Sequence, residues 1–438
     1  MSSWIFARRR RAIPSRQPAG DRQRYGLSAS RVPLIIGMMT LLTTPSLTGQ
    51  NPDVSFPGQY RINSYIVDND DGSEDDQTAS RLRIRQDIDL EFDDGLSTHL
   101  QVELGHTTGN LTTTDLDLKV RHALMTYRTD RVSVQAGLLP LADRFGDTLF
   151  SSDWDYNPLA AAVEATVGPG TLRAFAGTLD EGLEDDADDD TRHYQVDYEQ
   201  SIGEIDWNVG ASHLSTPDPG GRSRRHWNAG VGLKRPFGRT EVRALVMASA
   251  TDAALLSGGT DGDGIAITLQ LTREFERGRF GLLLTHATGE EDGSGFLPIM
   301  SVVRTNGYWG HTGILTVQGP TDTGFDGDAV NVSNNGYGLT SLQGRFEFPI
   351  TERLGGYVAA GWFGNTDAAQ RDSTLGEELM AMGTFHLTKI LALDFGAAIA
   401  DLGDGVSGYF QGAAGAFNQP IGVERTKVAL FARLQAEF

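Results

Sequence analysis

The sequence of 438 residues contains no cysteine. This absence excludes disulfide scaffolds, Cys-ligated zinc and thiol catalysis. Beyond the first fifty residues there is also no run of 18 apolar residues, which excludes a membrane-spanning helix. Basic residues are scarce, because 37 Lys and Arg stand against 58 Asp and Glu and give a formal charge of −21. A nucleic-acid partner needs a basic surface and is therefore not expected.

Residues 1–50 have the composition of a secretory signal. They carry eight Arg and one Asp, then an apolar stretch from Val32 to Leu47, and small residues at Thr48 and Gly49. This order of charged, apolar and small residues predicts a signal peptide with a long basic n-region over 1–50. Because these residues contribute +7, the remaining chain carries a formal charge of about −28. We predict that 51–438 is one exported domain.

From Gly58 onward, hydrophobicity alternates with a period of two residues. In the clearest segment, 81–92, the odd positions are all charged and the even positions are apolar except for Gln86. Alternate side chains of a strand point to opposite faces, so one face of such a strand is charged and the other apolar. The pattern predicts an all-β chain with eighteen strands, near 58–67, 80–92, 96–108, 115–128, 131–139, 160–167, 171–179, 191–201, 204–214, 226–235, 239–250, 263–274, 278–288, 338–349, 353–364, 376–387, 390–402 and 424–438.

Two all-β architectures present such strands, a soluble sandwich or propeller and a transmembrane barrel. Three features favour the barrel. The strands are longer than the soluble average of about 5–6 residues. Short connections alternate with long acidic or Gly-rich ones. Aromatic residues occur where strands meet the short turns, as in an interfacial girdle; they are Phe92, Tyr127, Tyr198, Phe237, Phe275, Phe348 and Phe438.

The predicted fold is therefore a transmembrane antiparallel β-barrel of about 18 strands, with short periplasmic turns and long outer loops. Both ends of the domain are expected on the periplasmic side, with strand 58–67 paired to 424–438. The bacterial outer membrane is the expected location, and its lipid the expected surroundings. The terminal Phe438 lies in register with the apolar face of the last strand. It resembles the assembly signal of outer-membrane barrels, which implies the assembly machinery as a partner.

Residues 289–337 are predicted to form one long outer loop. The stretch 313–318 is apolar enough for a strand. However, the strand ending near Thr288 runs outward, and the strand beginning near Gly338 must run inward to reach the tight turn at Ile350. One full strand between them would break the alternation of directions. A loop of this length usually has a role, and we expect it to enter the lumen or cap its mouth.

Charged residues on the polar faces suggest a solute path. Basic residues gather on strands near the two ends of the domain, which become neighbours when a barrel closes. They are opposed by carboxylates on the same strands, and such an arrangement can select solutes in a water-filled pore. The alternative is that these charges only pair across strands. The candidate lumen residues are Arg61, Arg81, Arg83, Arg85, Lys119, Arg121, Arg425, Lys427 and Arg433.

The segment from Pro140 to Tyr156 is the densest cluster of charged and aromatic groups. It follows a strand and is too long for a simple turn. We interpret it as an inward-folding constriction that contacts sugars by stacking and hydrogen bonding, although an ordinary packed outer loop fits equally well. The candidate constriction residues are Asp143, Arg144, Asp147, Asp153 and Trp154.

Part of the chain resembles a known family. Arg81-Leu82-Arg83-Ile84-Arg85, together with Leu116–Tyr127 and Val132–Trp154, is similar to the N-terminal part of the alginate-export porins. The resemblance covers about 75 residues. It implies an eighteen-stranded outer-membrane barrel whose basic lumen passes polyuronates.

The function expected from these observations is passive diffusion of small hydrophilic solutes, with anionic saccharides as a candidate class. An outer-membrane adhesin or surface scaffold without an open channel is the alternative. The sequence has no Gly-x-Ser-x-Gly and no paired-His metal motif. No catalytic residues, metal or cofactor are therefore expected, and the protein is not expected to be an enzyme.

Overall fold

The computed structural model describes residues 52–69, 77–92, 94–107, 117–154, 156–180, 190–217, 223–252, 261–290, 293–303, 309–316, 330–366, 374–403 and 425–438. The predicted signal peptide, 1–50, lies outside these residues and stays a prediction. No helix within the described ranges is long and apolar enough to cross a membrane.

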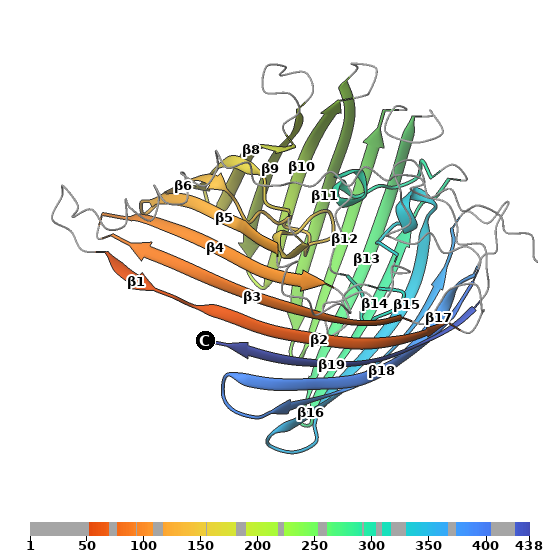
Figure 1. Ribbon diagram of the computed structural model, residues 1–438. Helices are drawn as coiled ribbons and strands as arrows, with labels where there is room; N and C mark the ends of the chain where they lie inside the picture. The colour runs from red at the N-terminus through yellow and green to blue at the C-terminus, as the bar shows by residue number, and fades with distance from the viewer. Residues whose placement is uncertain are drawn as a thin grey trace, which may run out of the picture. The chain divides into compact units, whose positions relative to one another are not determined.

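Eighteen antiparallel strands form a closed barrel (Figure 1). Each strand pairs with the next along the chain, and the last pairs with β2, which closes the ring. All eighteen predicted strands are present, with ends within about three residues of those expected. They are β2(Gly58–Asn69), β3(Gln77–Glu91), β4(Leu96–Thr107), β5(Asp117–Arg128), β6(Val132–Leu138), β7(Leu159–Val167), β8(Gly170–Asp180), β9(Thr191–Ile202), β10(Ile205–Pro217), β11(Ser223–Phe237), β12(Thr240–Thr251), β13(Gly262–Phe275), β14(Gly278–Ala287), β15(Leu339–Pro349), β16(Leu354–Gly364), β17(Thr374–His386), β18(Leu391–Leu402) and β19(Arg425–Glu437).

A short additional strand, β1(Asp53–Ser55), was not predicted. It pairs with the end of β3, where Asp53 faces Glu91. The connections alternate as expected, so one end of the barrel carries the short turns and the other the long loops. We refer to these as the short-turn end and the long-loop end.

The exposed large apolar side chains of the strands lie on the outer face, whereas a soluble protein buries most of its apolar side chains. On β2, Arg61 and Asn63 are buried on the inner side, whereas Ile66 is 51% exposed on the outer side. On β19, Lys427 is buried and Leu430 is 53% exposed. The alternation read from the sequence therefore sets which face each side chain occupies.

The barrel closes at its C-terminal residue. The N–H of Gly58 donates to the Phe438 carbonyl (2.7 Å), and the N–H of Phe438 donates to the Gly58 carbonyl (3.0 Å). The Phe438 ring lies over Gly58, in the space that a Cβ atom would need. The predicted pairing of 58–67 with 424–438 is confirmed.

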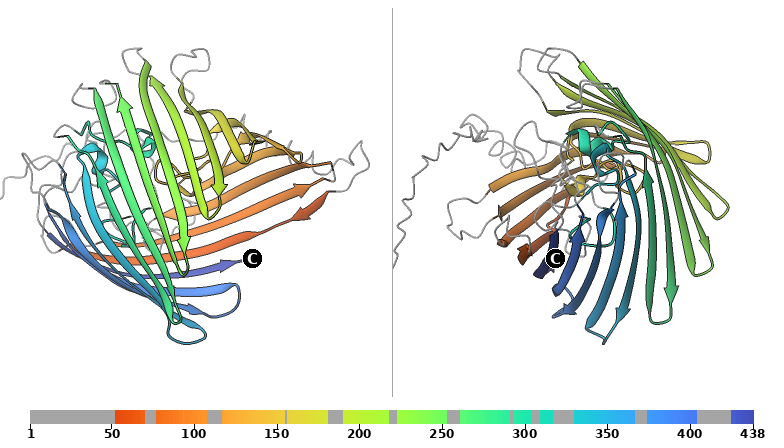
Figure 2. Two further views of the ribbon diagram at one scale, coloured as in Figure 1. Left: turned by 180° about the vertical axis from the view of Figure 1, so that it is seen from behind. Right: turned by 90° about the vertical axis from the view of Figure 1, so that its right-hand side faces the viewer.

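Two long connections fold into the barrel (Figure 2). The first inward loop, 139–158 between β6 and β7, contains the 3-10 helix η1(Ser152–Trp154). The second inward loop, 288–338 between β14 and β15, contains α2(Ile299–Val303) and η3(Asn334–Gly336). The two loops meet where the N–H of Met300 donates to the carbonyl of Leu149 (2.9 Å). β14 pairs directly with β15, and the described part of 289–337 holds no strand. The assignment of 289–337 to one outer loop stays a prediction.

The strand β5 departs from the simple alternation through a bulge. The register of β4 and β5 shifts between Gln101 and Val102, which face His122 and Val120 and leave Arg121 as a bulge. Arg121 and His122 are consequently both buried on the inner side, as is Leu124. An unbroken alternation that keeps Lys119 and Arg121 inward would place Leu124 on the outer face, so the bulge reverses the two faces beyond it. The bulge also explains why Tyr127 faces outward.

Candidate solute path through the barrel

The inner face of β3 changes the sign of its charge along the strand. Arg81, Arg83 and Arg85 lie toward the long-loop end, and Asp87 and Asp89 lie toward the short-turn end. All five side chains are partly exposed. The three arginines therefore form a partly exposed basic strip on the inner wall, toward the long-loop end.

A carboxylate on the neighbouring strand β4 balances part of the positive charge of this strip. Glu103 on β4 accepts a hydrogen bond from Arg85 Nε (2.7 Å) and lies 3.4 Å from Lys119 Nζ. Its Oε2 is also 3.6 Å from Arg121 Nε. One carboxylate thus interacts with three cations of the inner wall.

Other predicted lumen residues face inward but are covered. Arg61 is 6% exposed and Lys427 is 0% exposed, so neither lines the open lumen. Arg121 donates to the carbonyl of Ser152 (2.7 Å) and thereby fastens the first inward loop. Arg433 Nε donates to Asp394 on β18 (2.7 Å). The side chain of Arg425 lies outside the described residues. The described side chains among these residues are buried or paired at the wall.

Asp143 organises the first inward loop from within. It is buried and accepts the backbone N–H groups of Phe145 (2.6 Å), Asp147 (3.0 Å), Phe150 (3.1 Å) and Leu149. Burial raises the pKa of this carboxyl to about 7, although the backbone donors lower it. Asp143 was predicted to contact solute, but its position inside the loop gives it a structural role.

The tip of the loop presents the remaining predicted residues. Arg144 bridges Glu164 (2.7 Å) and Glu199 (3.2 Å) on the barrel wall. Asp147 is half-buried; burial, with neighbouring Asp153, raises its pKa, and Arg243 opposes that shift. Asp153 is exposed, and the side chain of Trp154 lies outside the described residues.

A polar hollow lies beneath this tip, toward the short-turn end. Its volume is about 550 Å³, and its lining includes Glu199, Asn208, Lys234 and Arg243. The Arg243 guanidinium fills the space next to Gly146 that a Cβ atom would occupy. The loop tip therefore forms a charged contact with the wall above a water-accessible space.

Several anchors of the inward loops were not predicted. Tyr156 of the first loop hydrogen-bonds His193 on β9, which is fully buried between aromatic rings. Glu378 on β17 accepts backbone N–H groups of the second loop. Nothing local in the sequence separates these residues from other inward-facing ones, because their partners are 37 and 63 to 65 residues away. No group of three or more His, Asp or Glu side chains in the described ranges could hold a metal.

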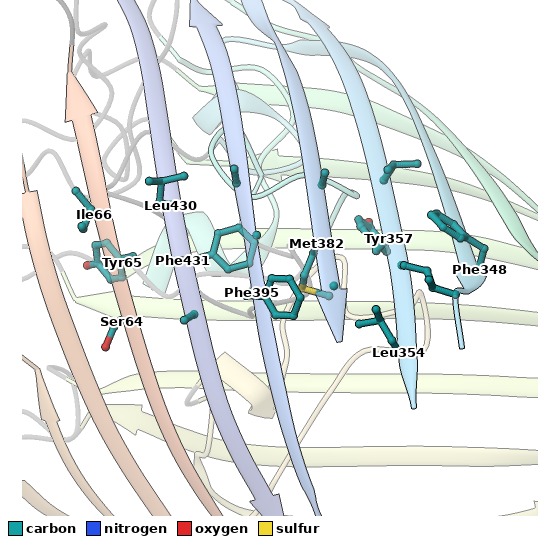
Figure 3. A pocket seen from close by; sticks show the side chains of 18 of the residues that line it. Ser64, Tyr65, Ile66, Phe348, Leu354, Tyr357, Met382, Phe395, Leu430 and Phe431 are labelled. Atoms are coloured by element: carbon teal, nitrogen blue, oxygen red, sulfur yellow. The ribbon is translucent and has the colours of Figure 1, made fainter. Parts of the chain in front are cut away.

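A second hollow lies outside the barrel. This groove of about 870 Å³ crosses the outer faces of β15 to β19 and β2 (Figure 3). Apolar side chains line it, including Ile66, Phe395 and Leu430. Its lining also includes Tyr65 and Phe431, which are buried residues of β2 and β19.

Comparisons with known proteins show a likeness in fold. No protein-family model matches the chain, and no curated protein matches it. The chain is similar to Pseudomonas aeruginosa OccK9 (OpdG), with 13% identity and a TM-score of 0.58 over 88% of this chain and 99% of that one. Acinetobacter baumannii OccAB1 shares 11% identity with a TM-score of 0.58, over 88% and 97%. P. aeruginosa OpdK, solved with vanillate, shares 13% identity with a TM-score of 0.52, over 88% and 99%.

OpdK is an outer-membrane protein. The likeness therefore shows that the chain has the fold of bacterial outer-membrane porins, as predicted. It supports this general class and does not single out the alginate-export porins.

Proposed function

We propose that the protein is a bacterial outer-membrane porin through which small hydrophilic solutes diffuse passively. The observation that carries this proposal is the reversed distribution of side chains around a closed barrel. Large apolar residues such as Leu159, Val231 and Leu379 are exposed on the outer face. Soluble proteins rarely expose continuous apolar patches above a few hundred Å². Lipid is the surrounding that stabilises such a surface, and charged inner walls suit a wet lumen.

The export and assembly of the protein belong to the same proposal. Residues 1–50 serve as the signal peptide, and 51–438 remain as the barrel domain. The outer-membrane assembly machinery recognises the C-terminal strand that ends in Phe438, whose ring and backbone complete the closure against Gly58.

Acidic saccharides, uronates among them, are the proposed preferred solutes. The basic strip of Arg81, Arg83 and Arg85 supports this preference, because arginine stays charged and binds planar carboxylates through two parallel hydrogen bonds. The resemblance of this segment to the alginate-export porins supports it as well. The acidic residues of the long connections do not exclude this preference, because the field of an exposed charge is screened over about 8 Å in physiological salt.

Replacing the three arginines together tests this preference. In R81Q/R83Q/R85Q, the reversal potential under a KCl gradient in a planar bilayer should shift toward cations, and uptake of acidic sugars should slow. Arg235→Gln is the matched control, because Arg235 is exposed and stacks on Phe237, 4.6 Å from its ring centre, at the short-turn end. If the triple variant keeps both the reversal potential and the uptake rate, the arginines serve only structural pairing.

The two inward loops favour one other candidate function. Both bury apolar side chains inside the barrel, among them Phe150 and Leu315. A lumen filled in this way also suits an adhesin or surface scaffold that conducts nothing. The two candidates differ in whether solutes cross a membrane that contains the protein.

A further inference from the structure

A single buried carboxylate holds the middle of the second inward loop. Glu378 on β17 is 3% exposed and points into the barrel. Its Oε1 accepts the N–H groups of Gly313 (2.8 Å) and Ile314 (2.9 Å), and its Oε2 accepts that of Leu315 (2.8 Å). Successive backbone N–H groups that converge in this way form a concave anion-binding nest. Here the anion is a side chain of the barrel wall.

Glu378 and the loop depend on each other energetically. A buried charge is tolerated only when it is paired or fully hydrogen-bonded. The N–H groups of 313–315 have no strand partner, so they equally need an acceptor. Removing either the carboxylate or the N–H donors leaves the other group without a hydrogen-bond partner in a dry environment. An unsatisfied buried polar group costs more free energy than an intact hydrogen bond contributes.

Further contacts place the same segment against the wall. The N–H of His311 donates to Gln343 on β15 (2.8 Å), and the Tyr357 hydroxyl on β16 donates to the His311 carbonyl (2.6 Å). Ile314 and Leu315 are fully buried in an apolar cluster with residues of the inner wall. Residues 309–316 therefore occupy space inside the lumen beside β15 to β17.

We propose that Glu378 is a positioning residue that fixes 309–316 inside the lumen and thereby sets the upper size of the solutes that pass. The inference rests on the proposed porin function. A glutamine at this position keeps the size of the side chain but turns an N–H₂ group toward the backbone donors. Loss of the charge-assisted hydrogen bonds raises the fraction of molecules with an undocked segment by a factor on the order of 100.

The absence of cysteine allows docking to be measured separately from transport. Val330 belongs to the same loop, is fully buried, and donates its N–H to the Leu315 carbonyl (3.0 Å). A V330C variant therefore carries one thiol that reacts with a maleimide only when the segment leaves the wall. Folded barrels are selected beforehand by their heat-dependent electrophoretic mobility.

We expect V330C alone to react slowly and V330C/E378Q to react on the order of 100 times faster. The matched control is E377Q, because Glu377 directly precedes Glu378 in β17 and is exposed on the outer face. V330C/E377Q should react as slowly as V330C. E378D, which keeps the charge but shortens the side chain, serves where E378Q yields no folded barrels and should react faster than V330C. Equal rates in V330C and the available Glu378 variant, or a fast E377Q control, would overturn the proposal.

Transport by the same proteins completes the test. E378Q should raise single-channel conductance and admit oligosaccharides that the parent protein excludes. Fast labelling with unchanged conductance and size limit in a conducting parent would also overturn the proposal. If no variant conducts although labelling changes as expected, the docking role of Glu378 stands and the porin function fails.

Discussion

At the scale of single residues, buried carboxylates decide where the inward loops lie. Asp143 gathers four backbone N–H groups of its own loop, and Glu378 gathers three from a loop more than sixty residues away. Alternation along the strand places Glu378 on the inner face, but period two cannot tell a docking residue from a solute contact. The dense cluster of charged and aromatic residues around Asp143 in the sequence marked it as a candidate. The sequence did not show that Asp143 binds the backbone of its own loop.

We expect His311 to make the docking of the second inward loop dependent on pH. Its Nδ1 contacts the Gly310 carbonyl and its Nε2 is buried without a hydrogen-bond partner, while Arg345 and Tyr357 lie near it on the wall. Burial, with Arg345, lowers the pKa of His311 to about 3. In the undocked segment the imidazole has its ordinary pKa near 6.5. Between pH 3 and pH 6.5 the undocked form therefore binds more protons than the docked form. Docking is therefore complete above pH 6.5 and weakens as the pH falls toward 3.

We predict that lowering the pH from 7.5 to 5 increases the undocked fraction on the order of 30-fold through this imidazole. The measurement is the labelling rate of V330C, divided by that of the exposed thiol in D153C at the same pH. The H311Q variant, which cannot titrate, should lose most of this dependence. An equal pH dependence in H311Q and the parent would show that His311 plays no part.

At the scale of elements, strands follow from sequence and loops do not. The strand 81–92 alternates so strictly that both of its faces are fixed by composition. The direction of neighbouring strands also excluded a strand within 289–337. The bulge at Arg121 could not be predicted from the alternation, because a single extra residue leaves the pattern on either side nearly intact. It is recognised only from the register with the partner strand. The folding of loops into the lumen depends on contacts distant in sequence, such as Tyr156 with His193.

The closing strand pair gives a prediction for assembly. Deleting Phe438 removes the paired backbone hydrogen bonds with Gly58 and the ring that covers it. The amount of barrel in outer-membrane fractions should fall several-fold, whereas Phe438→Tyr, which keeps both contacts, should assemble normally. Quantitative blotting of membrane fractions provides the comparison. Normal yield of the deletion variant would show that this contact is dispensable for closure.

At the scale of the whole molecule, the protein encloses polar walls within an apolar outer surface. The barrel has an even number of strands, so both of its ends lie together at the short-turn end. Two loops fold into the lumen and pack against its wall, and the basic strip on β3 is partly exposed. The apolar outer surface could be predicted from the sequence, because it requires only that polar and apolar residues alternate with a period of two. The covered state of Lys427 was not predictable, because it arises from the tertiary packing of the barrel.

The most direct test of this account is osmotic swelling of liposomes that contain the purified, folded barrel. We predict that small neutral and acidic monosaccharides enter and swell the liposomes, and that entry slows steeply for longer oligosaccharides. Protein-free liposomes and liposomes with heat-unfolded protein should stay unchanged. If correctly folded protein produces no swelling with any small sugar, the lumen is closed to solutes and the barrel is a scaffold, not a porin.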